Sequence, residues 1–162
     1  MLKQSSNFRP NGFSLIELMA VLVILSILAA TAMPMAQLVA KRGKEQELRH
    51  DLRQMRDAID AYKRAWDEGR ITRKVGETGY PPTLDILAKG VEDIRDPKKT
   101  KIYFLRRIPT DPMAGKGLVE AESWKTRSYL SPPDEPKSGE DVYDVLSRSE
   151  DVGLNGIPYK KW

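Results

Sequence analysis

Residues 11–22 read NGFSLIELMAVL and place a single carboxylate, Glu17, near the start of an apolar stretch. No residue from 18 to 40 is charged. As a helix rising about 1.5 Å per residue, this stretch is long enough to cross the ~30 Å hydrocarbon core of a membrane. Inserting a carboxylate there costs about 2.5–3.5 kcal/mol. Glu17 therefore either lies at the headgroup level and marks the end of the span, or it has a functional partner.

The residues before the apolar stretch favour a short leader. Residues 1–12 contain Lys3 and Arg9 but no acidic residue, and they end in Pro-Asn-Gly, which does not readily continue a helix. The alternative is a conventional secretory signal, cut after its apolar middle at an A-x-A-like site such as residues 30–32. Glu17 would interrupt that apolar middle, which weakens the alternative.

The stretch GFSLIEL at residues 12–18 resembles the processing motif of class III prepilins, which type IV pilins and type II secretion pseudopilins share. The resemblance implies cleavage between Gly12 and Phe13 by a membrane-embedded prepilin peptidase, and N-methylation of Phe13. It also implies that Glu17 faces the amino terminus of a neighbouring subunit during assembly. This contact would supply a partner, since opposite charges in a low-dielectric environment offset their desolvation only when paired.

Composition favours one modest domain after the span. The chain has 162 residues, of which 31% are charged and none is cysteine. About 120 residues follow the span, which is close to the commonest domain size. Because no disulfide can form, an export destination is predicted from the N-terminus alone. Lys41, Arg42 and Lys44 nearly balance the basic leader, so the positive-inside rule does not fix the orientation.

The helix is predicted to continue beyond the membrane. Apolar residues recur there at spacings of three and four: Leu48, Leu52, Met55, Ile59, Tyr62 and Trp66. This pattern is typical of a helix that buries one face against a sheet or a partner helix. Gly69 is predicted to end the helix as its C-terminal cap. Pro34 is predicted to kink the apolar stretch without ending it.

Beyond the helix the sequence predicts short elements separated by proline and glycine. Thr83 is expected to cap a short helix over residues 83–87. Residues 126–130 and 141–146 are predicted to be strands. The loop 131–140, rich in proline, glycine and charge, separates them, and we expect them to pair antiparallel.

Several of these stretches resemble the major pseudopilin of type II secretion, the G-type subunit. The matching stretches are Gly79-Tyr80-Pro81, LRRIPTDP at residues 105–112, Ser128-Tyr129, VYDV at residues 142–145, and Trp162. The resemblance implies an α+β, pilin-like fold, in which a long N-terminal α-helix packs on a small antiparallel β-sheet. The first half of that helix would be transmembrane and the second half amphipathic.

The same resemblance implies how the chain is divided and what it does. Residues 1–12 would be the leader, residues 13–40 the transmembrane or filament-core helix, and residues 41–162 a periplasmic domain. The mature chain would be a single-pass inner-membrane protein and a structural subunit of a pseudopilus that supports protein export. The alternative is a major or minor subunit of a type IV pilus, which serves motility, adhesion or DNA uptake.

The resemblance also implies partners. These would be further copies of the chain in a filament, the prepilin peptidase, the inner-membrane assembly platform with its cytoplasmic ATPase, minor pseudopilins, and membrane lipid before assembly. Nucleic acid is not expected as a partner, because basic residues are interleaved with acidic ones rather than gathered in a stripe.

Calcium is the one cofactor that the resemblance raises, since G-type pseudopilins commonly bind it in a C-terminal loop. Calcium needs about six to eight oxygen ligands. The loop here offers Glu150, Asp151 and Asn155, but Ile-Pro-Tyr at residues 157–159 replaces an acidic residue that the family usually supplies. We therefore expect no cofactor. The alternative to a calcium site is a loop held by its own turns and by aromatic packing of Tyr159 and Trp162.

Catalysis has little support in the sequence, and we expect a protein that is not an enzyme. The one histidine, His50, lies away from the apolar stripe of the helix and is predicted to be a solvated surface residue. With this one histidine and no cysteine, neither a thiol nucleophile nor a histidine-rich metal site can form. A membrane-anchored enzyme that uses carboxylates stays open as an alternative.

Overall fold

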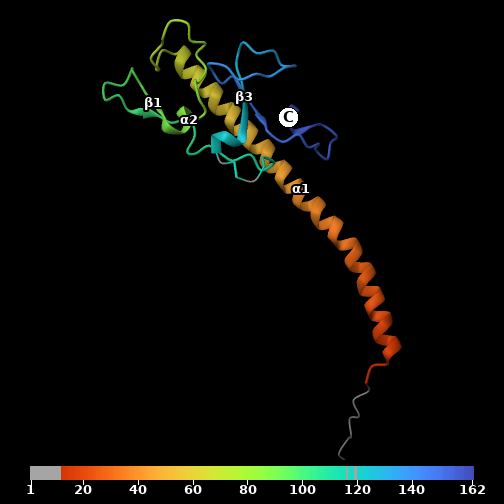
Figure 1. Ribbon diagram of the computed structural model, residues 1–162. Helices are drawn as coiled ribbons and strands as arrows, with labels where there is room; N and C mark the ends of the chain where they lie inside the picture. The colour runs from red at the N-terminus through yellow and green to blue at the C-terminus, as the bar shows by residue number, and fades with distance from the viewer. Residues whose placement is uncertain (1–11, 116, 119) are drawn as a thin grey trace, which may run out of the picture. The chain divides into compact units, whose positions relative to one another are not determined.

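The structure is a computed structural model that describes residues 12–115, 117–118 and 120–162 (Figure 1). The predicted leader therefore lies outside the described residues, except for Gly12. The chain divides into two units, with the boundary between Lys41 and Arg42. The first helix, α1, spans Leu15–Asp67 and continues across this boundary.

In the first unit, α1 is mostly apolar and its side chains are exposed. All residues from 12 to 30 and from 32 to 37 are exposed, while Leu38 is half-buried. Pro34 lies inside α1, and the helix continues on both sides of it. Proline lacks a backbone N–H and its ring crowds the preceding turn, so a kink at this position stays a prediction.

In the second unit, α1 buries the face that its sequence pattern predicts. Leu48, Leu52, Met55, Ile59 and Tyr62 are all buried, and Trp66 packs against them half-buried. These side chains form one stripe along the helix because residues three and four apart lie on the same face. The predicted stripe is therefore confirmed.

The C-terminal end of α1 is a Schellman motif, which confirms the predicted role of Gly69. Gly69 adopts a left-handed φ of 70°, which glycine tolerates without a Cβ clash. Its N–H donates to the Trp66 carbonyl at 2.9 Å, and the N–H of Arg70 donates to the Ala65 carbonyl at 2.9 Å. These two bonds satisfy carbonyls that the helix itself leaves unpaired.

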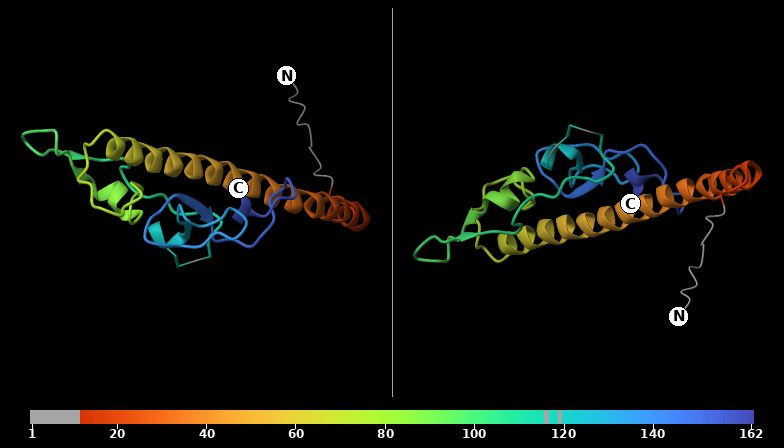
Figure 2. Two further views of the ribbon diagram at one scale, coloured as in Figure 1. Left: turned by 90° about the horizontal axis from the view of Figure 1, so that it is seen from above. Right: turned by 90° about the horizontal axis from the view of Figure 1, so that it is seen from below.

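The remaining elements are short. In chain order they are α2 (Asp85–Lys89), β1 (Val91–Glu92), β2 (Lys101–Ile102), the 3-10 helix η1 (Glu120–Ser123), β3 (Trp124–Arg127), β4 (Asp144–Ser147) and the 3-10 helix η2 (Tyr159–Lys161). β1 pairs antiparallel with β2, and β3 pairs antiparallel with β4. Within the second unit, α2 lies beside the last turns of α1, β1 lies past the end of that helix, and the β3–β4 pair lies beside its preceding turns (Figure 2).

The core lies between α1 and these short elements. Trp124 begins β3 and is 2% exposed, and Val145 in β4 is fully buried. In the register of this sheet Trp124 faces Ser147, and Arg127 faces Asp144. The buried hydrophobic side chains beyond the helix are Ile71, Leu84, Leu87, Leu105, Ile108, Trp124, Val142, Val145 and Tyr159.

The predicted α+β architecture is confirmed, with differences in detail. The strands form two separate two-stranded sheets, and the β1–β2 pair was not predicted. Two-residue strands are too short to show an alternating pattern. The short helix begins at Asp85 without a side-chain cap, so the prediction that Thr83 caps it is wrong.

The strand bounds also differ from those predicted. β3 ends at Arg127 instead of residue 130 because the chain leaves the ladder at Ser128. The Ser128 N–H donates to the Lys137 carbonyl at 2.9 Å, and its hydroxyl donates to Asp141 at 2.5 Å. Because Asp141 accepts this hydrogen bond, it does not join the ladder, and the partner strand β4 begins at Asp144 instead of residue 141.

Candidate functional site

The junction between Gly12 and Phe13 is exposed and lies outside regular structure. Residues 12–14 precede α1, and Phe13 is 79% exposed. A Cβ added at Gly12 would meet nothing within 4 Å, and this residue has no left-handed φ. The described fold therefore does not require glycine here. This leaves recognition by a processing enzyme as a reason for the residue, and cleavage stays a prediction.

Glu17 lies in the first turn of α1, three residues after Ser14. The Ser14 carbonyl accepts the N–H of Leu18 at 3.1 Å, and this hydrogen bond begins the helix. A carboxylate in the first turn of a helix interacts favourably with the helix dipole. The sequence analysis missed this structural role. Among the described residues, the Glu17 carboxylate has no hydrogen-bond or ion-pair partner.

The first unit presents a large apolar surface. Its exposed hydrophobic side chains are Phe13, Leu15, Ile16, Leu18, Met19, Val21, Leu22, Val23, Ile24, Leu25, Ile27, Leu28, Met33, Met35 and Val39. By length and composition, this part of α1 suffices to cross a membrane. The Ser26 hydroxyl donates to the Leu22 carbonyl at 2.7 Å, so this polar group is satisfied within the helix.

Of the three candidate calcium ligands in the C-terminal loop (residues 148–162), Glu150 and Asn155 contact other protein groups through their side chains. Lys125 and Lys160 each approach one carboxylate oxygen of Glu150, at 3.3 Å and 2.5 Å. Bonds from these lysines hold the pKa of Glu150 below its ordinary value. The side-chain oxygen of Asn155 accepts the N–H of Ile157 at 3.0 Å.

These residues do not fit a calcium site. Calcium prefers several carboxylate and carbonyl oxygens that point toward one position. Here the ammonium groups of Lys125 and Lys160 already bind the carboxylate of Glu150. Asp151 is exposed, and its carbonyl accepts the N–H of Tyr159 at 3.0 Å. Among residues 12–115, 117–118 and 120–162, no three acidic, histidine or cysteine side chains gather closely enough to hold a metal ion.

Glu45, which the sequence analysis missed, connects α1 to this loop. It is 6% exposed and continues the apolar stripe, three residues before Leu48. Its carboxylate accepts the N–H of Leu154 at 2.7 Å and the hydroxyl of Tyr159 at 2.9 Å. Burial, together with this hydrogen bond, raises the pKa of Tyr159 to about 12. An acidic residue at a stripe position was the signal that could have found it.

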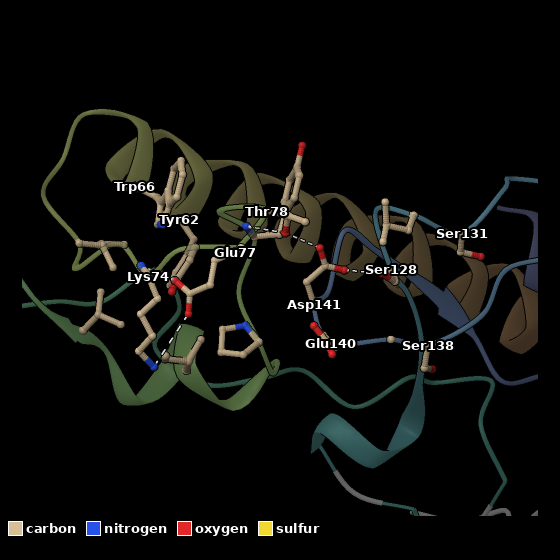
Figure 3. Close-up of a pocket in the computed structure, with 18 of the residues that line it drawn as sticks. Tyr62, Trp66, Lys74, Glu77, Thr78, Ser128, Ser131, Ser138, Glu140 and Asp141 are labelled. Atoms are coloured by element: carbon tan, nitrogen blue, oxygen red, sulfur yellow. Dashed lines mark hydrogen bonds and ion pairs between the residues drawn. The ribbon is translucent and has the colours of Figure 1, made fainter.

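A cavity of about 1020 Å³ lies beside the last turns of α1 in the second unit (Figure 3). Tyr62 and Trp66 line it from the helix, and Thr78, Ser128 and Asp141 line it from loops. The indole nitrogen of Trp66 is buried and has no hydrogen-bond partner within the part of the chain that the structure describes.

The buried carboxylate that lines this cavity, Asp141, already accepts hydrogen bonds from neighbouring loops. Asp141 accepts the hydroxyls of Thr78 and Ser128 and, at 3.0 Å, the N–H of Tyr129. Burial by itself raises the pKa of Asp141, but these hydrogen bonds outweigh burial and hold it below its ordinary value. Such a carboxylate joins loops and is a poor general base. His50 is exposed, as predicted.

Comparisons with known proteins agree with the N-terminal motif. Residues 7–33 match the family model described as the prokaryotic N-terminal methylation motif. No solved structure gives a significant match.

The chain is also similar to curated proteins named type II secretion system core protein G. It is 32% identical to the Pseudomonas aeruginosa protein over 106 residues, which cover 63% of this chain and 67% of that protein. Identity to the Aeromonas hydrophila protein is 31% over 108 residues, covering 64% and 68%. Identity to the Escherichia coli protein is 26% over 147 residues, covering 88% and 83%. With its methylation motif and its pilin-like α+β fold, the chain belongs to the family of type II secretion system core protein G.

Proposed function

We propose that the chain is a structural subunit of a type II secretion pseudopilus, which polymerises from the inner membrane and supports protein export. The exposure of the apolar half of α1 is the observation that carries this proposal. Such a surface is stable in lipid or against other helices, and a filament subunit meets both environments in turn. Family membership supplies the type of filament.

Processing is the first step of the proposed function. The prepilin peptidase cuts between Gly12 and Phe13, and the new amino terminus at Phe13 is methylated. The exposed, irregular backbone at this junction supports the proposal, because a protease needs an extended segment. Intact mass of the membrane-extracted protein tests it. A chain beginning at N-methyl-Phe13 is expected, and a chain beginning near Met33 would instead indicate a conventional signal peptide.

Residues 13–40 then anchor the chain in the inner membrane as a single span, with residues 41–162 in the periplasm. The apolar half of α1 supports the span, and the orientation follows from family membership. Protease added to spheroplasts should degrade the domain, whereas a cytoplasmic domain would be protected. The proposed partners are the assembly platform with its cytoplasmic ATPase, and the minor pseudopilins.

Assembly exchanges lipid contacts for contacts between helices, which costs little because both are apolar. In this exchange we place Glu17 opposite the amino terminus of Phe13 in a neighbouring subunit. Its lack of a partner among the described residues supports this placement. The pair would offset the cost of placing each charge in a low-dielectric filament core.

Glu17→Gln tests the pairing, because glutamine keeps the size of the side chain but carries no charge. We expect insertion and cleavage at wild-type levels and loss of filaments, measured by membrane fractionation and by shearing assembled filaments from overexpressing cells. Ser14→Ala is the matched control, since it changes a side chain at the same end of the helix and keeps the charge of Glu17. Wild-type filaments from Glu17→Gln would disprove the pairing.

A type IV pilus subunit would share this processing and this helix. The two filaments differ in what is lost when the gene is deleted. For a pseudopilus, secreted proteins accumulate in the periplasm, while surface pili and twitching motility are unchanged. Loss of surface pili with normal secretion would instead support the pilus.

A further inference from the structure

The C-terminal loop is closed first by its own backbone. The Gly153 N–H donates to the Ile157 carbonyl at 2.9 Å, and Val152 forms a bridge with Pro158. The Gly156 N–H donates to the Gly153 carbonyl at 3.0 Å. The loop therefore folds back on itself as a tight hairpin-like turn.

Glu45 fastens this turn to α1. Its carboxylate binds one donor inside the turn, the N–H of Leu154, and one donor beyond it, the hydroxyl of Tyr159. Tyr159 is 1% exposed and packs edge-on against the ring of Trp162, with 5.0 Å between the ring centroids. A buried carboxylate is expensive unless it is hydrogen-bonded, so Glu45 fixes both donors in place.

The end of the loop is fastened to the same helix by arginines. Arg56 donates to the main-chain oxygen of Trp162 at 2.8 Å and to Asp144 at 2.8 Å. The Arg49 guanidinium lies 4.4 Å from the centroid of the Trp162 ring. Two arginines of α1 therefore hold the end of the loop through its main-chain oxygen and its last aromatic ring.

We propose that this loop is closed without calcium. Lys125 and Lys160 neutralise Glu150 in place of a divalent cation, and Glu45 supplies the anion that orders the backbone of the turn. The loop in this chain thus folds without the ion, whereas a calcium-dependent loop folds only when the ion binds. For calcium to bind, Glu150 would have to exchange these two surface ion pairs for contacts with a single ion.

The first test is the response of the full-length protein in detergent to calcium. Scanning calorimetry in millimolar calcium chloride and in EGTA should give the same unfolding midpoint, because an ion that binds only the folded state raises the midpoint by mass action. A higher midpoint in calcium would overturn the proposal. Magnesium chloride at equal concentration controls for ionic strength.

A local measurement complements the midpoint. Trypsin cleaves after Arg148, Lys160 and Lys161, and intact mass identifies which bond is cut. We expect equally slow cleavage within the loop in calcium and in EGTA. Cleavage that is rapid in EGTA and suppressed by calcium would show that the ion closes the loop and would overturn the proposal.

Glu45→Gln then tests the anchor. Removing its charge weakens both hydrogen bonds, so we expect faster cleavage in the loop and a lower midpoint, to the same extent in calcium and in EGTA. Glu47→Gln is the matched control, since Glu47 is exposed on the same helix two residues away. Wild-type cleavage in Glu45→Gln, or recovery in calcium, would contradict the proposal. If this variant does not fold, the comparison of calcium with EGTA on the wild-type protein still decides.

Discussion

The two halves of α1 differ in where their apolar side chains find a partner. In the second half these side chains form a stripe, and the short elements of the same chain bury it. In the first half apolar side chains surround the helix, and residues 15–30 are exposed throughout. A stripe specifies one packing partner inside the fold, whereas an apolar circumference suits lipid or several neighbouring helices. One continuous helix thus serves two environments through the arrangement of its side chains.

Leu48→Ala should lower the free energy of unfolding of the domain more than the other changes below. Leu48 is fully buried, and truncating such a side chain costs about 2–5 kcal/mol through lost burial and a residual cavity. Leu25→Ala is the matched control, because Leu25 is 54% exposed in the first half. Urea unfolding in detergent, followed by near-ultraviolet circular dichroism, measures both. Equal destabilisation by the two changes would break the contrast between the halves.

Leu25→Lys tests the first half of α1 by placing a charge among its apolar side chains. A lysine near the middle of a span costs about 2.5–3.5 kcal/mol to insert, so we expect a smaller fraction of the protein to resist alkaline extraction from membranes. Gln54→Lys, at an exposed position in the second half, should leave this fraction unchanged. If Leu25→Lys remains fully membrane-integral, residues 13–40 do not behave as a span.

Gly79→Ala should lower the free energy of unfolding by a smaller amount. It tests whether the packed half of α1 extends as far as Trp66. Gly79 has a φ of +85°, and an added Cβ would lie 2.7 Å from Cε3 of Trp66. We expect a loss of about 1–3 kcal/mol from backbone strain and this clash. Gly76→Ala has a comparable φ, +93°, but no atom within 4 Å of the added Cβ. If Gly79→Ala costs no more than Gly76→Ala in urea unfolding, Trp66 is not tightly held.

The features that the sequence predicts correctly are those in which many residues repeat one physical requirement. The stripe from Leu48 to Trp66 and the cap at Gly69 follow from helix geometry, and both are confirmed. The existence and pairing of β3 and β4 were also predicted. Their bounds were not, because a single side chain, Asp141, draws Ser128 out of the ladder.

Features that depend on contacts between distant residues escaped prediction. Glu45 binds Leu154 and Tyr159 across more than a hundred residues of sequence. Its place on the apolar stripe marks it as unusual, but no local pattern identifies these two partners. The roles of Gly12, Phe13 and Glu17 stay predictions, because they concern a peptidase and neighbouring subunits. A single chain carries only one side of each of those interactions.

The distribution of tryptophan has a practical consequence for following assembly. All three tryptophans, Trp66, Trp124 and Trp162, belong to the second unit, and the apolar half of α1 has none. Intrinsic fluorescence of the native protein therefore reports on the domain and is insensitive to the surroundings of the apolar half. A tryptophan introduced at Leu25 would add an emission signal from that half. Brominated lipids would quench this signal in the membrane, and the quenching would be relieved as the subunit enters a filament.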